Sequence, residues 1–126
     1  MTFSELLAEI QKLRREEQRS LTEDYLEIVV SKDGLDPLNK VLAGYFGPPL
    51  KPEGSAPSGE ANRHAKPYGG IRKDQTLYFR QAEGYSEYAF LWPWGSGTRI
   101  TIKILRSRSA SPSTGHLGFF AKLFGK

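Results

Sequence analysis

Few residues in this sequence combine the type and spacing that catalysis or metal binding requires. The chain has two histidines, His64 and His116, and no cysteine, which excludes thiolate nucleophiles and thiolate metal sites. Glu60 precedes His64 by four positions, and on a helix this spacing would place both side chains on one face. The neighbouring prolines and glycines favour a solvated loop instead. Gly95-Ser96-Gly97 is typical of a hairpin turn, and no phosphate-binding or nucleophile motif is present.

We therefore predict a protein that is not an enzyme and that holds no cofactor and no metal. An enzyme would need scattered Asp, Glu, Tyr and Lys side chains that only the fold could assemble. Residues 1–60 contain seven Lys and Arg against eleven Asp and Glu, and residues 61–126 contain eleven against three. The two halves therefore carry −4 and +8. The basic half favours an anionic partner such as nucleic acid, an acidic protein or an anionic lipid surface.

The last ten residues, 117–126, have the pattern of a docking segment. At 100° per residue their large apolar side chains fall within an arc of about 160°, and the lysines fall outside it. The apolar set is Leu117, Phe119, Phe120, Leu123 and Phe124, and the lysines are Lys122 and Lys126. The pattern predicts an amphipathic helix that covers its apolar stripe on its own domain, on a partner protein or on a membrane.

This segment is similar to the amphipathic membrane-targeting tails of bacterial division-site ATPases of the Min type. The resemblance covers nine or ten residues and none of the body, and it implies attachment to a membrane surface. The N-terminus is acidic and amphipathic, unlike a secretory signal, so we expect a cytoplasmic protein that can be peripheral at the inner face of the membrane. Burying the five apolar side chains yields roughly 7 to 15 kcal/mol, and ordering the segment costs a similar amount. The segment therefore needs a second contact, for which the basic half is the candidate.

A second hypothesis is a basic domain that binds single-stranded RNA or DNA. Alternation places Tyr78 and Arg80 on one side of a strand, and Arg99 with Lys103 on one side of another. If both pairs share the solvent-exposed face, a ring lies beside cations, as base stacking and phosphate contact require. The candidate residues are Tyr78, Arg80, Arg99, Lys103, Arg106 and Arg108. The alternative interpretation is the ordinary solvated side of a strand.

The elements that position these residues follow from periodicity. A capping-box pattern at Thr2 and Glu5 starts a helix over 3–19, and Asp36-Pro37 starts one that ends near Phe46. Period-two patterns predict strands over 75–80, 86–92 and 98–105, which form an antiparallel meander with one face buried and one exposed. The segment 25–31 predicts a further strand at an edge. Two helices covering the apolar face of this sheet define an α+β two-layer domain.

The predicted domain covers 1–106. It includes a long Pro/Gly-rich loop, 47–72, in which 63–72 is basic and the better candidate for a contact. A flexible linker, 107–116, then leads to the docking segment. Within the meander, Trp92-Pro93-Trp94 has two interpretations: an exposed ledge for a ligand or peptide, or a cover over the open end of a small core.

Overall fold

The structure is a computed structural model that describes residues 1–109. The predicted docking segment 117–126 and most of the linker 107–116 lie outside the described residues. The helices are α1 (Phe3–Gln11), α2 (Leu35–Phe46) and α3 (Gly59–Ala65), with short 3-10 turns η1 (Lys32–Gly34) and η2 (Lys66–Tyr68). The strands are β1 (Glu17–Leu21), β2 (Tyr25–Ser31), β3 (Thr76–Ala82), β4 (Tyr85–Pro93) and β5 (Arg99–Arg108).

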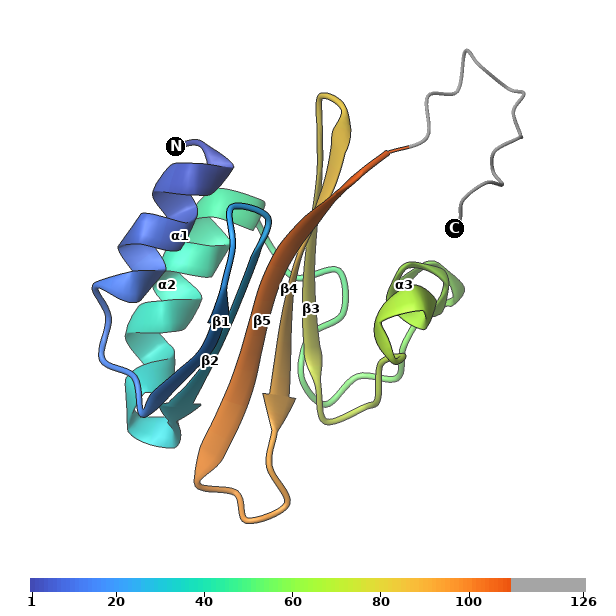
Figure 1. The fold of residues 1–126 in the computed structure, drawn as a ribbon. Helices are drawn as coiled ribbons and strands as arrows, with labels where there is room; N and C mark the ends of the chain where they lie inside the picture. The colour runs from blue at the N-terminus through green and yellow to red at the C-terminus, as the bar shows by residue number, and fades with distance from the viewer. Residues whose placement is uncertain (110–126) are drawn as a thin grey trace, which may run out of the picture.

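The predicted α+β two-layer fold is confirmed, with five strands in place of three or four. The sheet has the order β1-β2-β5-β4-β3, and every neighbouring pair is antiparallel. The meander β3-β4-β5 forms as predicted. The segment 25–31 does form a strand, but it lies inside the sheet, because β1 occupies the edge beyond it. Figure 1 shows α1 and α2 on one side of the sheet and α3 on the other.

The first helix begins as predicted and ends early. The Thr2 hydroxyl accepts a hydrogen bond from the Glu5 amide at 3.1 Å, and the Glu5 carboxylate accepts one from the Thr2 amide at 2.7 Å. The helix predicted over 3–19 stops at Gln11. The reason is that 17–21 pairs with β2, which supplies its backbone hydrogen bonds across strands instead of along a helix. Segment 17–21 has only one apolar residue, Leu21, and gave no strand signal.

The second helix ends at Phe46 as predicted, but it begins at Leu35. Its C-cap is Gly47, whose φ of +82° is accessible to glycine at little cost. At its start the N-cap position is Gly34, without a side-chain cap, so the predicted cap by Asp36 is wrong and Asp36 lies in the first turn. The preceding turn η1 displaced the helix start by two residues.

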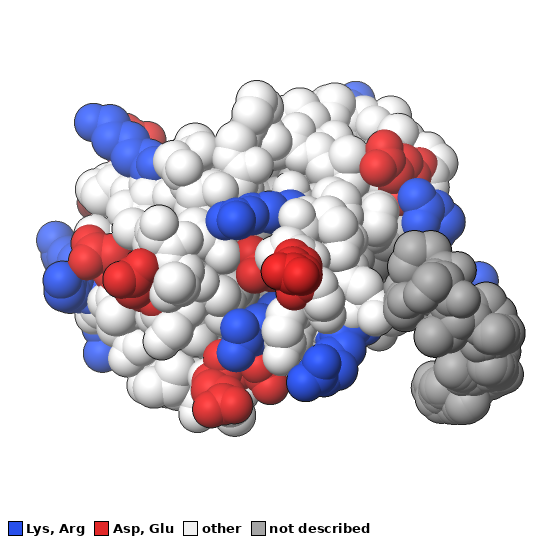
Figure 2. All heavy atoms as spheres, turned by 90° about the horizontal axis from the view of Figure 1, so that it is seen from above, with Lys and Arg blue, Asp and Glu red and all other residues white. Residues whose placement is uncertain are grey.

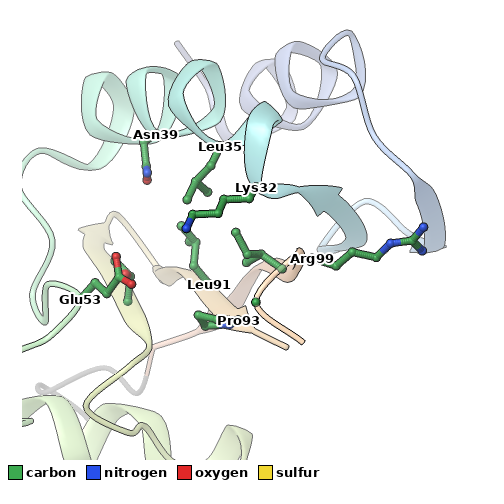
Figure 3. A pocket seen from close by; sticks show the side chains of 10 residues that line it. Lys32, Leu35, Asn39, Glu53, Leu91, Pro93 and Arg99 are labelled. Carbon is green, nitrogen blue, oxygen red and sulfur yellow. The ribbon is translucent and has the colours of Figure 1, made fainter. Parts of the chain in front are cut away.

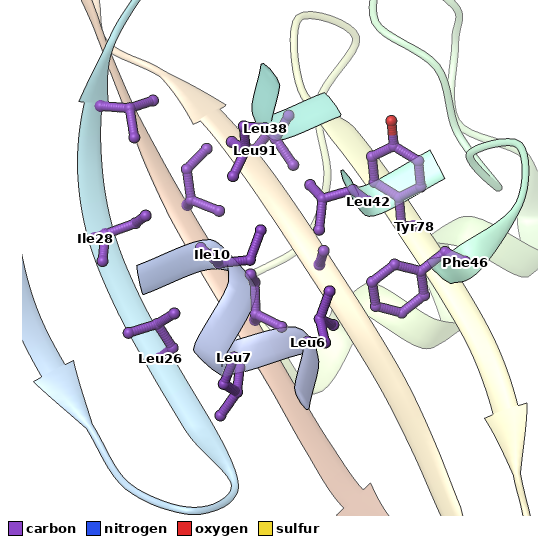
Figure 4. Packing of buried hydrophobic residues seen from close by; sticks show 14 of the residues in the cluster. Leu6, Leu7, Ile10, Leu26, Ile28, Leu38, Leu42, Phe46, Tyr78 and Leu91 are labelled. Carbon is purple, nitrogen blue, oxygen red and sulfur yellow. The ribbon is translucent and has the colours of Figure 1, made fainter. Parts of the chain in front are cut away.

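One hydrophobic cluster fills the space between the sheet and the helices α1 and α2, a side that we call the helix face. It consists mainly of leucine and isoleucine. Figure 4 shows α1 and α2 projecting their apolar stripes onto β2, β4 and β5. The labelled members are Leu6, Leu7, Ile10, Leu26, Ile28, Leu38, Leu42, Phe46, Tyr78 and Leu91.

The opposite side, which we call the second face, was predicted to be exposed, and this expectation is wrong. A second cluster lies there, in which Leu77 and Phe90 are fully buried beneath Ala61 and Ala65 of α3. The five consecutive residues from Glu87 to Leu91 in β4 are all buried. Strand β4 therefore carries apolar residues on both faces because both faces are covered.

The cover of the second face comes from the segment predicted as the long loop 47–72. Within it the Ser58 hydroxyl caps α3 by accepting from the Ala61 amide at 3.1 Å. The segment is fixed by Lys51, which is 1% exposed and donates to three carbonyl oxygens, those of Pro52, Lys73 and Gln75. These bonds satisfy the three ammonium protons and so stabilise the buried charge.

Candidate functional site

The predicted basic surface is divided between the two faces. Arg80, Glu87 and Arg106 are cross-strand neighbours, and they point to the helix face together with Tyr78 and Arg108. Lys103 pairs with Phe90 and Arg99 pairs with Ser31, which places both cations on the second face. Tyr78 is also 4% exposed, with its hydroxyl donated to Asn39. The condition on which the nucleic-acid hypothesis depended, one shared exposed face, is not met.

The cations of this set are largely engaged within the domain. Arg106 binds the Asp24 carboxylate at 2.7 Å, and Arg99 lies 3.6 Å from the Glu16 carboxylate. Both contacts join a basic residue of the C-terminal half to an acidic residue of the N-terminal half. The charge asymmetry along the sequence is therefore partly neutralised when the halves pack together. Figure 2 shows this result on one face, where basic and acidic side chains are interspersed.

A buried carboxylate explains the cations on the helix face. Glu87 is 4% exposed, accepts a hydrogen bond from the Tyr45 hydroxyl at 2.6 Å and lies between Arg80 and Arg106 in the strand register. The Arg80 guanidinium lies 4.7 Å from the centre of the Tyr45 ring. Burial and the Glu87 carboxylate raise the pKa of Tyr45, so its hydroxyl stays protonated and continues to donate. These groups stabilise the fold.

The two tryptophans close the second face. Trp92 packs edge-on against Phe90 and carries the Lys103 ammonium 3.9 Å from its ring centre. Trp94 folds back over the sheet and donates its indole N–H to the Thr101 hydroxyl at 2.8 Å. The Arg19 and Arg99 guanidinium groups lie 5.6 and 5.9 Å from the Trp94 ring. Of the two interpretations of this motif, the geometry favours a cover over a core, because both rings are packed and flanked by the protein's own cations.

The Glu60 and His64 pair does lie on a helix, contrary to the expectation of a loop. His64 Nδ1 is 2.7 Å from the Tyr88 hydroxyl, and its ring lies 4.3 Å from that of Phe79. Burial lowers the pKa of His64, and Arg63 lowers it further, whereas burial raises the pKa of Tyr88. Tyr88 is 5% exposed and belongs to the second cluster. This contact holds α3 on the sheet.

A small pocket opens between α2, the segment after Gly47 and the β4-β5 connection. Its floor is apolar and includes Leu91. Figure 3 shows the polar ends of Lys32, Asn39 and Glu53 directed into one space, while Arg99 points away from it. Its volume is about 200 Å³. Small-molecule sites usually measure about 300 to 1,000 Å³, so this hollow suits a few water molecules or a very small polar ligand.

A basic patch lies where the chain leaves the domain. Arg63 and Lys66 project from α3 and η2 and are exposed. The neighbouring Tyr68 donates its hydroxyl to Ser107 at 3.1 Å, which places this region beside the end of β5. We call Arg63 and Lys66 the α3 patch. Both residues lie in the segment 63–72, which the sequence predicts as a basic contact region, but the helix α3 was not predicted.

The part of the chain that the structure describes contains no helix long and apolar enough to cross a membrane, and no group of three or more potential metal-ligating side chains occurs in it. Its exposed large apolar side chains are Met1 and Leu21. Comparisons with known protein families, curated proteins and solved structures gave no match.

Proposed function

We propose that this protein is a non-catalytic adaptor that docks through its C-terminal segment, 117–126, to an anionic membrane surface. A groove on a partner protein is the alternative acceptor. The closure of the domain supports the proposal most. Both faces of the sheet are covered by the domain's own side chains, and the exposed large apolar residues of 1–109 are Met1 and Leu21. These two residues offer little exposed apolar surface to the five apolar side chains of the segment.

The energetics favour attachment at two points. Burying the five apolar side chains gives roughly 7 to 15 kcal/mol, and ordering ten residues costs about 10 to 20 kcal/mol. The segment alone therefore binds weakly. The α3 patch lies beside the end of β5, from which the segment continues, so both can touch one surface together. Each cation near an anionic leaflet adds about 1 kcal/mol.

Co-sedimentation with vesicles tests the proposal. We expect the full chain to sediment with vesicles that contain phosphatidylglycerol and to stay in solution with pure phosphatidylcholine. A chain that ends at Ser113 should stay in solution with both. The double variant Arg63→Ala and Lys66→Ala should bind the anionic vesicles about 2 kcal/mol more weakly, because two surface cations are lost.

The matched control removes two exposed cations from the side of the molecule that α1 and α2 cover. The variant Arg14→Ala and Lys40→Ala keeps the same net charge as the α3-patch variant and should bind like the unchanged chain. Equal sedimentation of the full and shortened chains would contradict the membrane form of the proposal. If the full chain stays in solution with both kinds of vesicle, a groove on a partner protein becomes the proposed acceptor of the segment.

A further inference from the structure

The two edges of the sheet differ in how they are protected. The outer strand β1 has five residues, carries the exposed charges of Glu17 and Arg19, and shifts register between Gln18 and Ser20. Short length, charge and a bulge are the usual protection against pairing with another strand. The other outer strand, β3, has seven residues and pairs with β4 in unbroken register from Thr76 to Ala82. Strand β3 is longer and has no register shift, and Arg80 is its one exposed charge.

Part of the β3 edge is capped within the chain, and the rest is open. Leu77 exchanges both of its outward backbone bonds with Lys51, at 3.0 and 3.1 Å. Because outward groups alternate along an antiparallel strand, Phe79 and Gln81 also direct their N–H and C=O groups outward. Within residues 1–109 no backbone hydrogen bond joins these four groups to another segment. The Gln81 side chain binds the neighbouring hairpin and Ser109, away from these groups.

A hollow of about 330 Å³ lies beside this edge on the helix face. It extends from Arg80 of β3 to α2, where Lys40, Val41, Gly44 and Tyr45 line it, and to Met1 and to Glu9 of α1. Gly44 has no side chain, and a Cβ atom built there would meet nothing within 4 Å, so this position leaves the hollow open. A strand added to β3 would send every second side chain to the helix face, where Arg80 points. The backbone edge and the hollow therefore form one surface.

The charges of the hollow favour an acidic occupant. Lys40 and Arg80 contribute two cations, and the carboxylate of Glu9 is bound to Lys12 at 2.8 Å. The Arg80 guanidinium lies 4.7 Å from the centre of the Tyr45 ring, which holds it in place. The planar N–H donors of the guanidinium match the geometry of a carboxylate. An acidic peptide would add carboxylates to a hollow in which cations predominate, whereas a basic peptide would add like charge.

We propose that the outer edge of β3 binds an extended acidic segment of a partner protein, which joins the sheet as a sixth strand. Backbone groups of Phe79 and Gln81 hold the peptide backbone, and Lys40 with Arg80 bind carboxylates on the side chains that face the hollow. This inference does not rest on the docking of 117–126. It provides the second binding surface that an adaptor requires.

The test uses the full chain labelled with ¹⁵N and three capped heptapeptides. The first alternates Glu and Val, the second alternates Lys and Val, and the third is the first with N-methyl groups on alternate amides. The Glu peptide should shift the Phe79 and Gln81 amide signals and slow their hydrogen exchange. The Lys peptide should bind at least roughly tenfold more weakly than the Glu peptide, because charged hydrogen bonds are lost. The methylated peptide, with its N-methyl groups on the amides that would face β3, should not bind.

A charge reversal provides the matched control. Arg80→Glu should exchange the preference between the Glu and Lys peptides, whereas Arg19→Glu on the opposite edge should leave it unchanged, with circular dichroism reporting that both variants fold. Equal binding of both peptides, or no shift at Phe79 and Gln81 with any peptide, would overturn the proposal. Concentration-dependent shifts of these amides without peptide would overturn it too, because a second copy of the chain would then occupy the edge.

Discussion

The two faces of the sheet are closed by different means. On the helix face, two amphipathic helices bring leucines and isoleucines onto the sheet, and residues such as Ile10 and Leu42 are fully buried. On the second face, the cover is a seven-residue helix, a 3-10 turn and two tryptophans. A helix of seven residues does not persist alone in water. The second cover therefore depends on tertiary anchors, whereas the first is favoured by the local sequence as well.

These anchors are polar and few. Lys51 fixes the segment that leads to α3, and the hydrogen bond between His64 and Tyr88 fixes α3 itself. Because a local opening of this cover exposes fewer apolar groups than an opening of the helix face, we expect it to require less free energy. We therefore expect the helix face to be rigid and the second face to open more readily. Three experiments on stability and hydrogen exchange test this difference.

The first prediction compares two fully buried leucines, one on each face. Leu42→Ala should lower the free energy of unfolding by about 3 to 5 kcal/mol, because the helix face is packed from several directions and cannot collapse around the cavity. Leu77→Ala should cost about 2 to 3 kcal/mol, since the small α3 can move toward the gap. Urea unfolding measures both. An equal cost at the two positions would remove the proposed difference between the faces.

The sequence predicted the start of α1 and the end of α2 correctly because these signals are local. The capping box at Thr2 and the glycine at position 47 each lie next to the helix end that they mark, whereas the end of α1 was misplaced. The edge strand β1 gave no such signal. Its five residues include one apolar side chain, and it forms because β2 offers backbone partners. Tertiary pairing here overrides local preference.

The second face was missed although β4 carried a sign of it. Tyr88, Phe90 and Trp92 alternate with Ala89 and Leu91, so both sides of the strand are apolar, a pattern typical of burial on both faces. The helix α3 also had a signal, a serine at position 58 in the N-cap position, but the prolines and glycines around it outweighed that single residue. Cover by a segment distant in sequence cannot be read from local periodicity.

The candidate basic residues lie on two faces because of the strand register. Alternation correctly grouped Arg99 with Lys103, and Tyr78 with Arg80, within each strand. Which groups share a face depends on how the strands pair, and a shift of one residue exchanges the faces. The tight turn at Glu83-Gly84 fixes the pairing of β3 with β4, but the longer connection before β5 leaves its register open in the sequence.

The second prediction concerns Lys51. Lys51→Met keeps most of the side-chain volume and removes the ammonium, so three carbonyl oxygens lose their buried donor. We expect a loss of about 1 to 3 kcal/mol of stability. Hydrogen exchange should show it chiefly in β3 and α3, while the amides of α1 and α2 keep their protection up to global unfolding. A uniform loss of protection over both faces would contradict the separate anchoring of the second face.

The third prediction concerns the pH dependence of the α3 anchor. The folded state lowers the pKa of His64, first through burial and then through Arg63. Between this lowered value and the ordinary value near 6.5, the unfolded chain binds more protons than the folded one, so stability increases with pH in that window. The contribution of His64 to stability is fully present above the ordinary pKa and is lost as the pH falls through the folded pKa.

The measurement compares the original chain with His64→Gln, because the subtraction cancels the titration of His116 and of the carboxylates. The difference in stability should depend on pH only below the ordinary histidine range, and acid should increase hydrogen exchange in α3 before it does so in α1. The effect should be the smallest of the three, since His64 is one partly accessible contact and Ala61 and Ala65 keep α3 packed. A difference that is flat with pH would show that His64 titrates alike in both states, which would leave Lys51 as the anchor that distinguishes the second face.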